Sequence, residues 1–326
     1  MNKERILVSG VKPTGRLHIG NYLGAMKQFV ELQNDYESYI FIADLHALTT
    51  LQNPKELSEN IVDIATDYLA IGLNPDRVTL FKQSDVPQVT ELAWIFNTIT
   101  TVPYLMRAHA FKDAEANRSE VNVGTFDYPL LMAADILIQD ADVVPVGLDQ
   151  KQHIEITRDV ALKFNRIFGD VFRVPEPLIL ENVQTILGTD GRKMSKNYKN
   201  TISLFSTDTE IQEAVMKIPT DSKGVNEPKD PDKDNIFALH KYFTEGPEFG
   251  ELRDKYEAGG VGYRESKEIL IKNIISFISP LREKRNKLAE KPKEIIEILK
   301  AGGEKARKRA EEKMKEVREK IGVNIY

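Results

Sequence analysis

Two segments of the sequence carry residue types that suit phosphate chemistry. Residues 9–21 read Ser-Gly-Val-Lys-Pro-Thr-Gly-Arg-Leu-His-Ile-Gly-Asn, and residues 191–197 read Gly-Arg-Lys-Met-Ser-Lys-Asn. In the first segment, Gly10 and Gly15 let the backbone turn sharply, and a helix that begins near His18 directs free N–H groups at a ligand. In the second segment, two lysines three positions apart offer compact charges that can follow a departing pyrophosphate. Both segments therefore suit phosphate.

Neither segment is one of the two commonest nucleotide-binding loops. The patterns G-x-G-x-x-G and G-x-x-x-x-G-K-[ST] are both absent from the first segment. Taken alone, it also fits an ordinary turn from a strand into a helix. The second segment, taken alone, also fits a solvated surface loop. The functional interpretation therefore depends on the two together and on the elements around them.

Strands and helices alternate around the first segment. Short apolar runs predict strands at Arg5–Val8, Tyr39–Ala43, Val78–Phe81 and Val143–Gly147, with helices at residues 22–32 and 53–72. This alternation predicts an α/β fold with a doubly wound parallel sheet. The polar residues Asp44 and His46 follow the second strand, at the edge of the sheet where such folds bind their ligands.

Two further regions are predicted to be helical. Residues from about 88 to 137 interrupt the order of the strands, and we predict a helical insertion there. Residues 204–326 carry apolar stripes at helical spacing, with a kink or a new helix at Pro280 and a helix end at Gly302-Gly303. The chain is therefore predicted to contain an α/β domain at 1–203 and an all-α domain at 204–326.

The composition is that of a folded protein and restricts its chemistry. The 326 residues are 41% hydrophobic and 29% charged, which fits one large or two medium domains. The lack of cysteine excludes disulfides and thiolate ligands, and only 5 histidines argue against structural zinc, so we predict no metal ligands. No apolar run is long enough to span a membrane and no secretory signal opens the sequence, which predicts a cytoplasmic protein without membrane contact.

The charge of the chain is unevenly distributed. The net charge is −5, yet residues 281–320 contain 15 Lys and Arg against 9 Asp and Glu. A basic segment on an acidic protein suits a contact with an RNA backbone. The alternative is an exposed helix whose charges pair with one another.

Four stretches together resemble the class I aminoacyl-tRNA synthetases. The sequence His18-Ile19-Gly20-Asn21 resembles the HIGH signature, and residues 193–197 resemble the KMSKS loop, in the expected order and at about the expected distance. Residues 128–137 and 145–155 resemble the tryptophan-specific branch of this class. The resemblance implies a Rossmann-like sheet of the HUP type in a catalytic domain at 1–203. It also implies a helical domain at 204–326 that binds the tRNA anticodon, and a homodimer joined through the helical insertion.

The predicted helix after residue 126 carries an acid among apolar neighbours. Asp135 shares one helix face with Tyr128, Met132 and Ile136, and a buried acid needs a partner. Because indole has one N–H donor and no acceptor, a carboxylate here can bind tryptophan, while the alternative is a capping or salt-bridged Asp. The resemblance further implies that Gln150 binds the substrate's amino group with Tyr128, and that His46 lies near its carboxylate. The predicted walls of the tryptophan site are Met132, Ile136, Val144 and Val146.

The resemblance also implies an ATP site, with Mg²⁺ carried by the nucleotide. The catalytic residues implied are His18, Asn21, Lys112, Lys193 and Lys196. The ATP contacts implied are Lys12, Pro13, Thr14, Gly20, Asn21, Gly147, Leu148, Asp149, Ile186, Lys193, Met194, Ser195, Lys196 and Asn197. Three positions depart from the pattern of the family, namely Lys12, Asn21 and Asn197, and we expect them to change rates without abolishing activity.

The implied reaction has two steps. L-Tryptophan and ATP would give tryptophanyl-adenylate and pyrophosphate, and the tryptophan would then pass to the 3′-terminal adenosine of tRNA(Trp). Two alternatives stay open at this point. One is a tyrosine-specific enzyme of the same class, which shares the fold and the signatures. The other is a synthetase-like RNA-binding protein without ligase activity.

Overall fold

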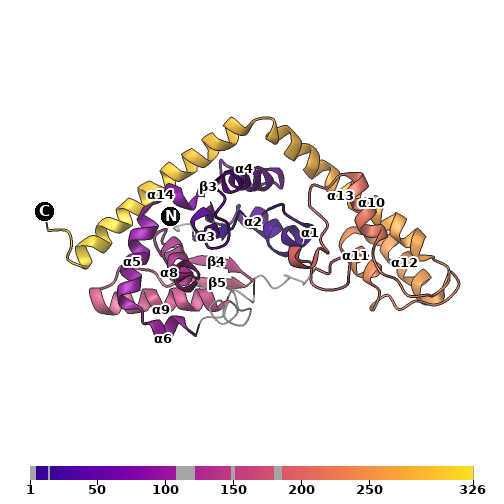
Figure 1. Ribbon diagram of the computed structural model, residues 1–326, viewed down its shortest axis with the longest axis horizontal. Helices are drawn as coiled ribbons and strands as arrows, with labels where there is room; N and C mark the ends of the chain where they lie inside the picture. Colours follow the sequence, from indigo (N-terminus) through magenta and orange to yellow (C-terminus); the bar gives the residue numbers. More distant parts are fainter. Residues whose placement is uncertain (1–4, 14, 108–121, 148–150, 180–185, 326) are drawn as a thin grey trace. The chain divides into compact units, whose positions relative to one another are not determined.

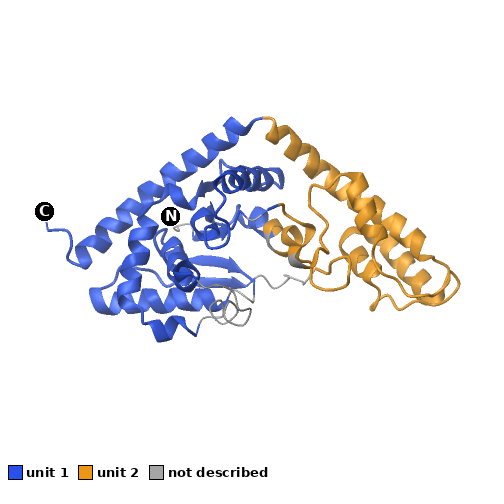
Figure 2. Cartoon of the chain, in the orientation of Figure 1, with its two compact units in different colours: residues 1–15, 28–181, 291–326 blue, residues 16–27, 182–290 orange. Residues whose placement is uncertain are grey.

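The computed structural model describes residues 5–13, 15–107, 122–147, 151–179 and 186–325. The chain forms two compact units, which are coloured separately in Figure 2. The first unit comprises residues 1–15, 28–181 and 291–326, and the second comprises residues 16–27 and 182–290. Among the described residues, no helix is long and apolar enough to cross a membrane.

The first unit is built on a five-stranded parallel sheet (Figure 1). The strands are β1 (Ile6–Val11), β2 (Glu37–Ile42), β3 (Val78–Lys82), β4 (Val143–Val146) and β5 (Glu176–Ile179). Their order is β3-β2-β1-β4-β5, and all neighbouring pairs are parallel. The predicted doubly wound sheet is therefore confirmed. The sequence did not predict β5, which contains Pro177 and lies at an edge of the sheet, where a residue without a backbone N–H is tolerated.

Helices connect the strands of the first unit. They are α2 (Lys27–Leu32), α3 (Asp44–Ala47), α4 (Pro54–Ala70), the 3₁₀ turn η2 (Gln83–Asp85), α5 (Gln88–Ile99), α6 (Val102–Leu105), α8 (Val123–Leu137) and α9 (Lys151–Phe168). Asn53 caps α4, because its side-chain oxygen accepts from the backbone N–H groups of Lys55 and Glu56. Pro54 occupies the first position of this helix, where no backbone N–H is needed.

Both faces of the sheet are buried, as its nearly continuous apolar strands require. Ile6, Val8 and Phe41 belong to a core cluster that includes residues of α5, α8 and α9. Leu7 and Ile40 point to the opposite face by the alternation of the strand, and they are buried as well. A sheet covered in this way leaves the ends of its strands as the place for a ligand.

Helix α14 (Pro292–Lys320) belongs to the first unit and continues through Gly302 and Gly303. The prediction that a helix ends at this glycine pair is therefore wrong. A Cβ atom on Gly302 would lie 1.9 Å from the backbone oxygen of Leu80 in β3, so the helix can approach the edge strand only through a glycine. Beyond this point, four residues between Ala306 and Val317 enter the core cluster of the first unit.

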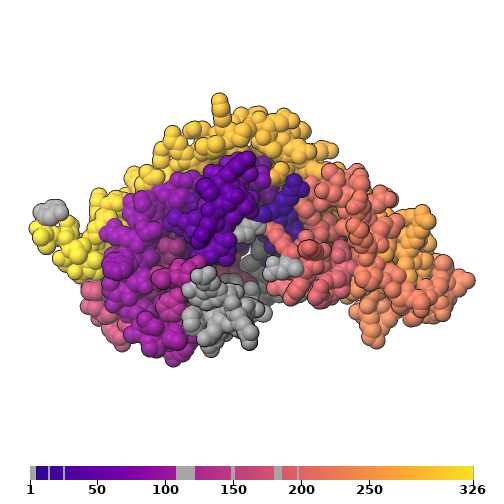
Figure 3. Space-filling model, viewed as in Figure 1, coloured from indigo at the N-terminus to yellow at the C-terminus, as the bar shows by residue number. Residues whose placement is uncertain are grey.

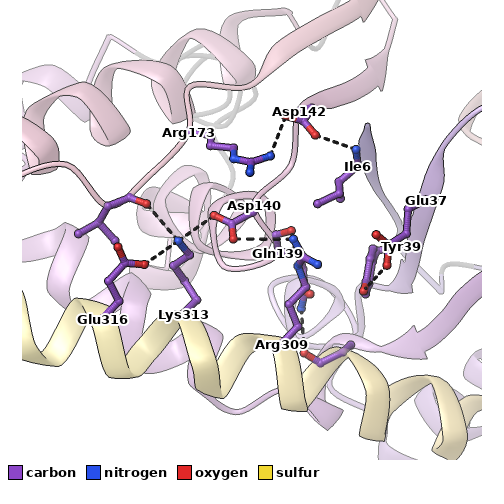
Figure 4. Close-up of polar contacts among 12 residues, drawn as sticks. Ile6, Glu37, Tyr39, Gln139, Asp140, Asp142, Arg173, Arg309, Lys313 and Glu316 are labelled. Carbon is purple, nitrogen blue, oxygen red and sulfur yellow. Dashed lines mark hydrogen bonds and ion pairs between the residues drawn. The ribbon is translucent and has the colours of Figure 1, made fainter. Parts of the chain in front are cut away.

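Basic side chains of α14 bind the first unit. Lys313 Nζ lies 2.9 Å from Asp140 Oδ1 and 3.1 Å from the backbone oxygen of Val171, and Arg309 donates to the backbone oxygen of Gln139 (Figure 4). In the space-filling view the C-terminal half of α14, in yellow, lies against the purple surface that includes α5 (Figure 3). Part of the basic charge that suggested an RNA contact therefore forms ion pairs and hydrogen bonds within the protein.

The close approach of Gly302 to β3 leads to a testable prediction about the stability of the protein. Gly302→Ala would force a methyl group into the backbone of β3, and we expect it to lower the free energy of unfolding by about 3 kcal/mol. The matched control is Gly250→Ala, in the interior of another helix, where an added Cβ meets no atom within 4 Å. The control should be stabilising by about 0.5–1 kcal/mol. Denaturant unfolding of both variants measures the difference, and equal effects would contradict the role of Gly302.

The second unit is helical. Its elements are α1 (Ile19–Asn21), the π-helical turn η1 (Tyr22–Met26), the 3₁₀ turn η4 (Lys196–Tyr198), α10 (Asp208–Met216), α11 (Asn235–Phe243), α12 (Gly246–Ala258) and α13 (Tyr263–Ala289). Phe237, Leu252 and Tyr256 form a core between α11 and α12. The single helix predicted at 22–32 is divided into η1 and α2, and Pro280 lies inside α13 instead of beginning a new helix.

The two units divide the chain differently from the boundary predicted between residues 203 and 204. Residues 16–27 and 182–203 join the helices of the second unit, while α14 joins the sheet of the first. The glycine contact and the basic side chains described above fix α14 on the first unit. Whether residues 204–326 bind the anticodon is a separate, functional prediction.

A buried histidine makes the stability of the second unit depend on pH. His240 Nδ1 lies 2.7 Å from Thr244 Oγ1, and Nε2 lies 3.1 Å from the backbone oxygen of Ser266. Burial lowers the pKa of His240 from 6.5 to about 4. The unfolded chain therefore binds the proton more readily than the folded chain. The stability of the folded protein is not reduced by this effect above pH 6.5, and it decreases as the pH falls from 6.5 toward 4.

Because the unfolded chain takes up a proton at His240, we expect the free energy of unfolding to fall by about 2 kcal/mol as the pH is lowered from 7 to 5. Urea unfolding at several pH values measures this loss. The variant His240→Gln keeps a polar side chain that does not titrate, and it should show a smaller decrease over the same range. An unchanged pH dependence in that variant would assign the loss to other groups.

Candidate active site

A cavity of about 260 Å³ opens at the carboxyl ends of β1 and β4. These two strands are the switch point of the sheet order, where doubly wound folds bind their ligands. The volume is close to the lower end of the range of about 300–1,000 Å³ for small-molecule pockets. Residues that were predicted for the site line this cavity, namely Lys12, His46, Tyr128, Met132, Ile136, Val144, Val146 and Gly147. Phe29, Phe41, Ser9 and Gly10 also line it and were not predicted for the site.

Glycine at position 10 shapes the wall of the cavity. A Cβ atom there would lie 2.4 Å from Cζ of Phe41, which is closer than carbon atoms can approach. The aromatic ring can therefore stand against β1 only because residue 10 has no side chain. Gly15 adopts a left-handed φ of 67°, as expected for the sharp turn predicted after β1.

A buried carboxylate lies beside the cavity. Asp135 is only 4% exposed, and its Oδ2 accepts from Gln83 Nε2 at 2.7 Å and contacts His46 Nε2 at 3.1 Å. Burial raises the pKa of Asp135, and the hydrogen bonds from His46 and Gln83 oppose this shift. Asp135 lies on the face of α8 that carries Met132 and Ile136, which line the cavity. The site therefore combines apolar walls with a buried carboxylate beside them.

Tyr128 is held between two histidines. Its hydroxyl lies 2.5 Å from His153 Nε2, and its ring meets the ring of His46 edge to face at 5.9 Å between centroids. Lys12 Nζ lies 5.9 Å from the centre of the same ring. Burial lowers the pKa of Lys12. A tyrosine hydroxyl and an ammonium group are thus fixed at the wall of the cavity, where a zwitterionic ligand can contact both.

The two signature segments meet within the second unit. His18 caps α1: its Nδ1 accepts from the backbone N–H of Asn21, and the side-chain oxygen of Asn21 accepts from the backbone N–H of His18. The backbone N–H of Gly20 lies 3.3 Å from the sulfur of Met194. Burial, with a contribution from the charge of Lys196, lowers the pKa of His18 to about 4. His18 is therefore neutral at pH 7 and acts as a hydrogen-bonding group.

The loop that carries the two lysines is organised by Asn200. Its side-chain oxygen accepts from the backbone N–H of Ser195 at 2.8 Å, and its Nδ2 donates to Asp190 at 2.6 Å and to the backbone oxygen of Lys193 at 3.1 Å. The hydrogen bond from Asn200 holds the pKa of Asp190 down at about 2. Lys193 and Lys196 themselves are exposed. The backbone N–H of Met194 donates to Ile186, which brings that predicted residue into the same loop.

Several predicted residues lie outside the described part of the chain. These are Thr14, Lys112, Leu148, Asp149 and Gln150, together with the side chain of Asn197. The predicted tryptophan contacts that the structure describes lie together in the first unit. Among the predicted ATP contacts, Lys12, Pro13 and Gly147 belong to the first unit, while Gly20, Asn21, Ile186 and residues 193–196 belong to the second.

Sequence reasoning missed Gln83 and the role of His153. Gln83 is 1% exposed and directly follows β3. The rule that polar residues after a strand face the ligand site was applied to Asp44 and His46, and it also points to Gln83. His153 lies on α9, and no pattern in the sequence indicated its contact with Tyr128. Among the described residues, no three His, Asp or Glu side chains gather as metal ligands.

Comparison with known proteins shows the family of this chain. The family described as tRNA synthetases class I (W and Y) matches residues 1–279. A tryptophan–tRNA ligase from Fusobacterium nucleatum is 49% identical over 98% of this chain and 99% of its own. The solved structure of tryptophanyl-tRNA synthetase from Campylobacter jejuni, in complex with ADP and tryptophan, matches with a TM-score of 0.92 and 44% identity over 98% of this chain and 99% of its own.

The fold and the two signature segments are those of the class I tRNA synthetases, and the chain belongs to the W and Y family of that class. Within it, the chain groups with the tryptophan–tRNA ligases, at 44–49% identity over nearly its whole length. A tyrosyl-tRNA synthetase from Archaeoglobus fulgidus, complexed with tyrosine, is 21% identical, with a TM-score of 0.67 over 87% of this chain and 91% of its own. That likeness concerns the fold alone.

Proposed function

We propose that the chain activates L-tryptophan with ATP and transfers it to tRNA(Trp). The tryptophan carboxylate attacks the α-phosphorus of ATP, which gives tryptophanyl-adenylate and releases pyrophosphate. The acyl group then passes to the 3′-terminal adenosine of the tRNA. The observation that carries this proposal is the apolar cavity with the buried acceptor Asp135 beside it. Indole matches this combination because it offers a large apolar ring and a single donor.

The cavity supports an orientation for the amino acid. Met132, Ile136, Val144 and Val146 would enclose the indole ring, and Asp135 would accept its N–H. Tyr128, with Gln150 beyond the described residues, would bind the amino group. His46 would face the carboxylate and Lys12 the nucleotide, so the reacting oxygen would point toward the nucleotide. The roles of Tyr128, Gln150 and His46 are those that the resemblance to the family implies, and the four apolar residues line the cavity.

The nucleotide would be bound mainly by charge and by backbone groups. Lys193, Lys196 and Lys112 would stabilise the triphosphate, and the positive charges would act most strongly as pyrophosphate leaves. His18, neutral at pH 7, would donate a hydrogen bond to a phosphate oxygen. Asn21, whose side chain completes the cap of α1, would contact the nucleotide beside Gly20. Mg²⁺ would arrive with ATP and neutralise phosphate charge.

Pyrophosphate exchange tests the proposal directly. Wild-type protein, ATP, radiolabelled pyrophosphate and each of the twenty amino acids are combined in turn, and only tryptophan should support exchange into ATP. Charging of tRNA(Trp) then tests the second step. Exchange with tyrosine would instead support the tyrosine-specific alternative. Failure to form any adenylate would favour an RNA-binding protein without ligase activity.

The helical region at 204–326 is proposed to contact the tRNA anticodon. Exposed basic residues remain near the junction of α13 and α14, including Lys284, Lys287 and Lys293. Such charges suit a phosphate backbone and predict that charging weakens as salt is raised. A ligase of this kind acts where tRNA and ATP are available, so a cytoplasmic location is part of the proposal.

Exposed apolar side chains support a homodimer through the helical insertion. Trp94 on α5 is 71% exposed, and Val102 and Met106, at the two ends of α6, are exposed as well. Large exposed apolar side chains on helices that follow one another in the sequence suit a surface that another protein covers. We propose that a second copy of this chain covers this surface.

Trp94→Glu should convert the dimer to a monomer, because a buried charge without a partner is costly at an interface. Sedimentation equilibrium at micromolar concentration measures the mass of both proteins. Trp94 is the single tryptophan of the chain, so its fluorescence in the wild type should also shift to longer wavelength on dilution. A monomeric wild type, or a dimeric variant, would contradict this assignment.

A further inference from the structure

Gln83 lies beside the cavity but does not line it, and its side chain is almost entirely buried. It opens the 3₁₀ turn η2 directly after β3. Its amide makes two hydrogen bonds: Oε1 lies 3.2 Å from the backbone nitrogen of His46, and Nε2 lies 2.7 Å from Asp135 Oδ2. A buried amide with both ends engaged has a fixed orientation.

The backbone of His46 determines the direction of these hydrogen bonds. A backbone N–H can only donate, so the end of the Gln83 amide that faces it must be the oxygen. The other end is then the NH₂ group, which can only donate to Asp135. Oδ2 of Asp135 therefore accepts this hydrogen bond. His46 Nε2 lies 3.1 Å from the same oxygen and donates to it when Asp135 is ionised.

Both of these hydrogen bonds to the Asp135 carboxylate reach the same oxygen, Oδ2. This leaves Oδ1 as the oxygen for a ligand. A carboxylate that rotates, or that carries a proton, no longer offers the same acceptor oxygen to the indole N–H. Two donors that hold Oδ2 from separate elements, η2 and α3, prevent this rotation.

We propose that Gln83 is a positioning residue that fixes the Asp135 carboxylate, through Oδ2, as the acceptor of the indole N–H. This inference rests on the proposed function and deepens it. Gln83 does not touch the substrate; it acts through Asp135. Its effect is therefore specific to amino acids that have an N–H at the indole position.

The experiment compares tryptophan with β-(3-benzothienyl)alanine, in which sulfur replaces the indole N–H. Pyrophosphate exchange gives kcat/KM for both substrates. In the wild type, tryptophan should be preferred at least tenfold over the analogue. In Gln83→Met, which has similar length and no hydrogen-bonding amide, kcat/KM for tryptophan should fall about 10- to 30-fold, mainly through KM. The kcat/KM for the analogue should change less than threefold, so the preference for tryptophan over the analogue should nearly disappear.

A second variant, Gln83→Glu, keeps an oxygen for the backbone N–H of His46 and replaces only the donor. The titratable groups beside Asp135 are then His46, Asp44 and the introduced carboxylate. At low pH one shared proton can restore the hydrogen bond to Oδ2. As the pH rises, the two carboxylates repel each other, so KM for tryptophan should rise with pH while KM for the analogue stays nearly constant.

Gln88→Met is the matched control, since Gln88 contacts Glu311 and lies away from the cavity. It should leave kcat/KM for both substrates unchanged. An equal loss for tryptophan and the analogue in both Gln83 variants would show a merely structural role and overturn the proposal. Wild-type kinetics for tryptophan in Gln83→Met would overturn it as well. A wild type without tryptophan-dependent exchange would instead refute the proposed function itself.

Discussion

Asp135→Ala is expected to raise the KM for tryptophan by between about tenfold and 100-fold in pyrophosphate exchange. A hydrogen bond to a charged group contributes about 1.5–3 kcal/mol, and each 1.4 kcal/mol corresponds to about a factor of ten. The substitution also leaves the donors of Gln83 and His46 without their shared acceptor. The KM for ATP should change less than about threefold, because Asp135 is proposed to contact only the amino acid.

Asp127→Ala is the control for this variant. Asp127 lies on the same helix and accepts from Asn97, and it is not part of the cavity. Its removal should leave the KM for tryptophan within about twofold. Thermal unfolding of both variants separates a loss of binding from a loss of fold. Unchanged tryptophan kinetics in Asp135→Ala would remove the indole assignment.

Lys196→Ala should lower kcat for tryptophan activation by about 100-fold, in the range found when one charge-stabilising donor is removed from an active site. The KM for tryptophan should stay within about threefold, because the cavity lies on residues of the first unit. The charge of Lys196 also contributes to the low pKa of His18, so that pKa should rise in the variant. NMR titration of His18 measures this second effect independently of activity.

Lys199→Asn provides the control for the loop. Lys199 is exposed on the same loop, and its φ of 53° is a conformation that asparagine tolerates well. The substitution removes one positive charge without straining the backbone, and kcat should change less than about threefold. If both variants lose the same activity, the general charge of the loop matters and the position of Lys196 does not.

The strands show what the sequence could predict about the fold. Tyr39–Ala43 is apolar throughout and Val78–Phe81 contains one polar residue, Thr79. Such runs are readable because a parallel sheet buries both of its faces. The short strand at residues 176–179 escaped prediction because Glu and Pro break its apolar pattern. The helix end predicted at Gly302 was wrong for a different reason. A glycine pair in a helical pattern usually marks a helix end, and only the contact with β3 explains why the helix continues.

The site was predictable where one element supplied the pattern. The spacing of Tyr128, Met132 and Ile136 on one helix indicated a common face, and the structure places all three at one cavity. Contacts between elements were not predictable. Gln83 and His153 act through side chains that meet residues far away in the sequence, and no periodicity encodes such pairs. The predicted contact of Asn21 with ATP stays a prediction, and the hydrogen bonds that the structure describes for this residue cap α1.

The place of α14 also affects how the protein can fold during synthesis. The core of the first unit includes Ala306, Ala310, Met314 and Val317, so the ribosome must make almost the entire chain before that core can close. A nascent chain that ends before residue 306 exposes the apolar surface which those side chains later cover. The strands of the first unit can pair early, but the unit reaches its native packing only after α14 has left the ribosome.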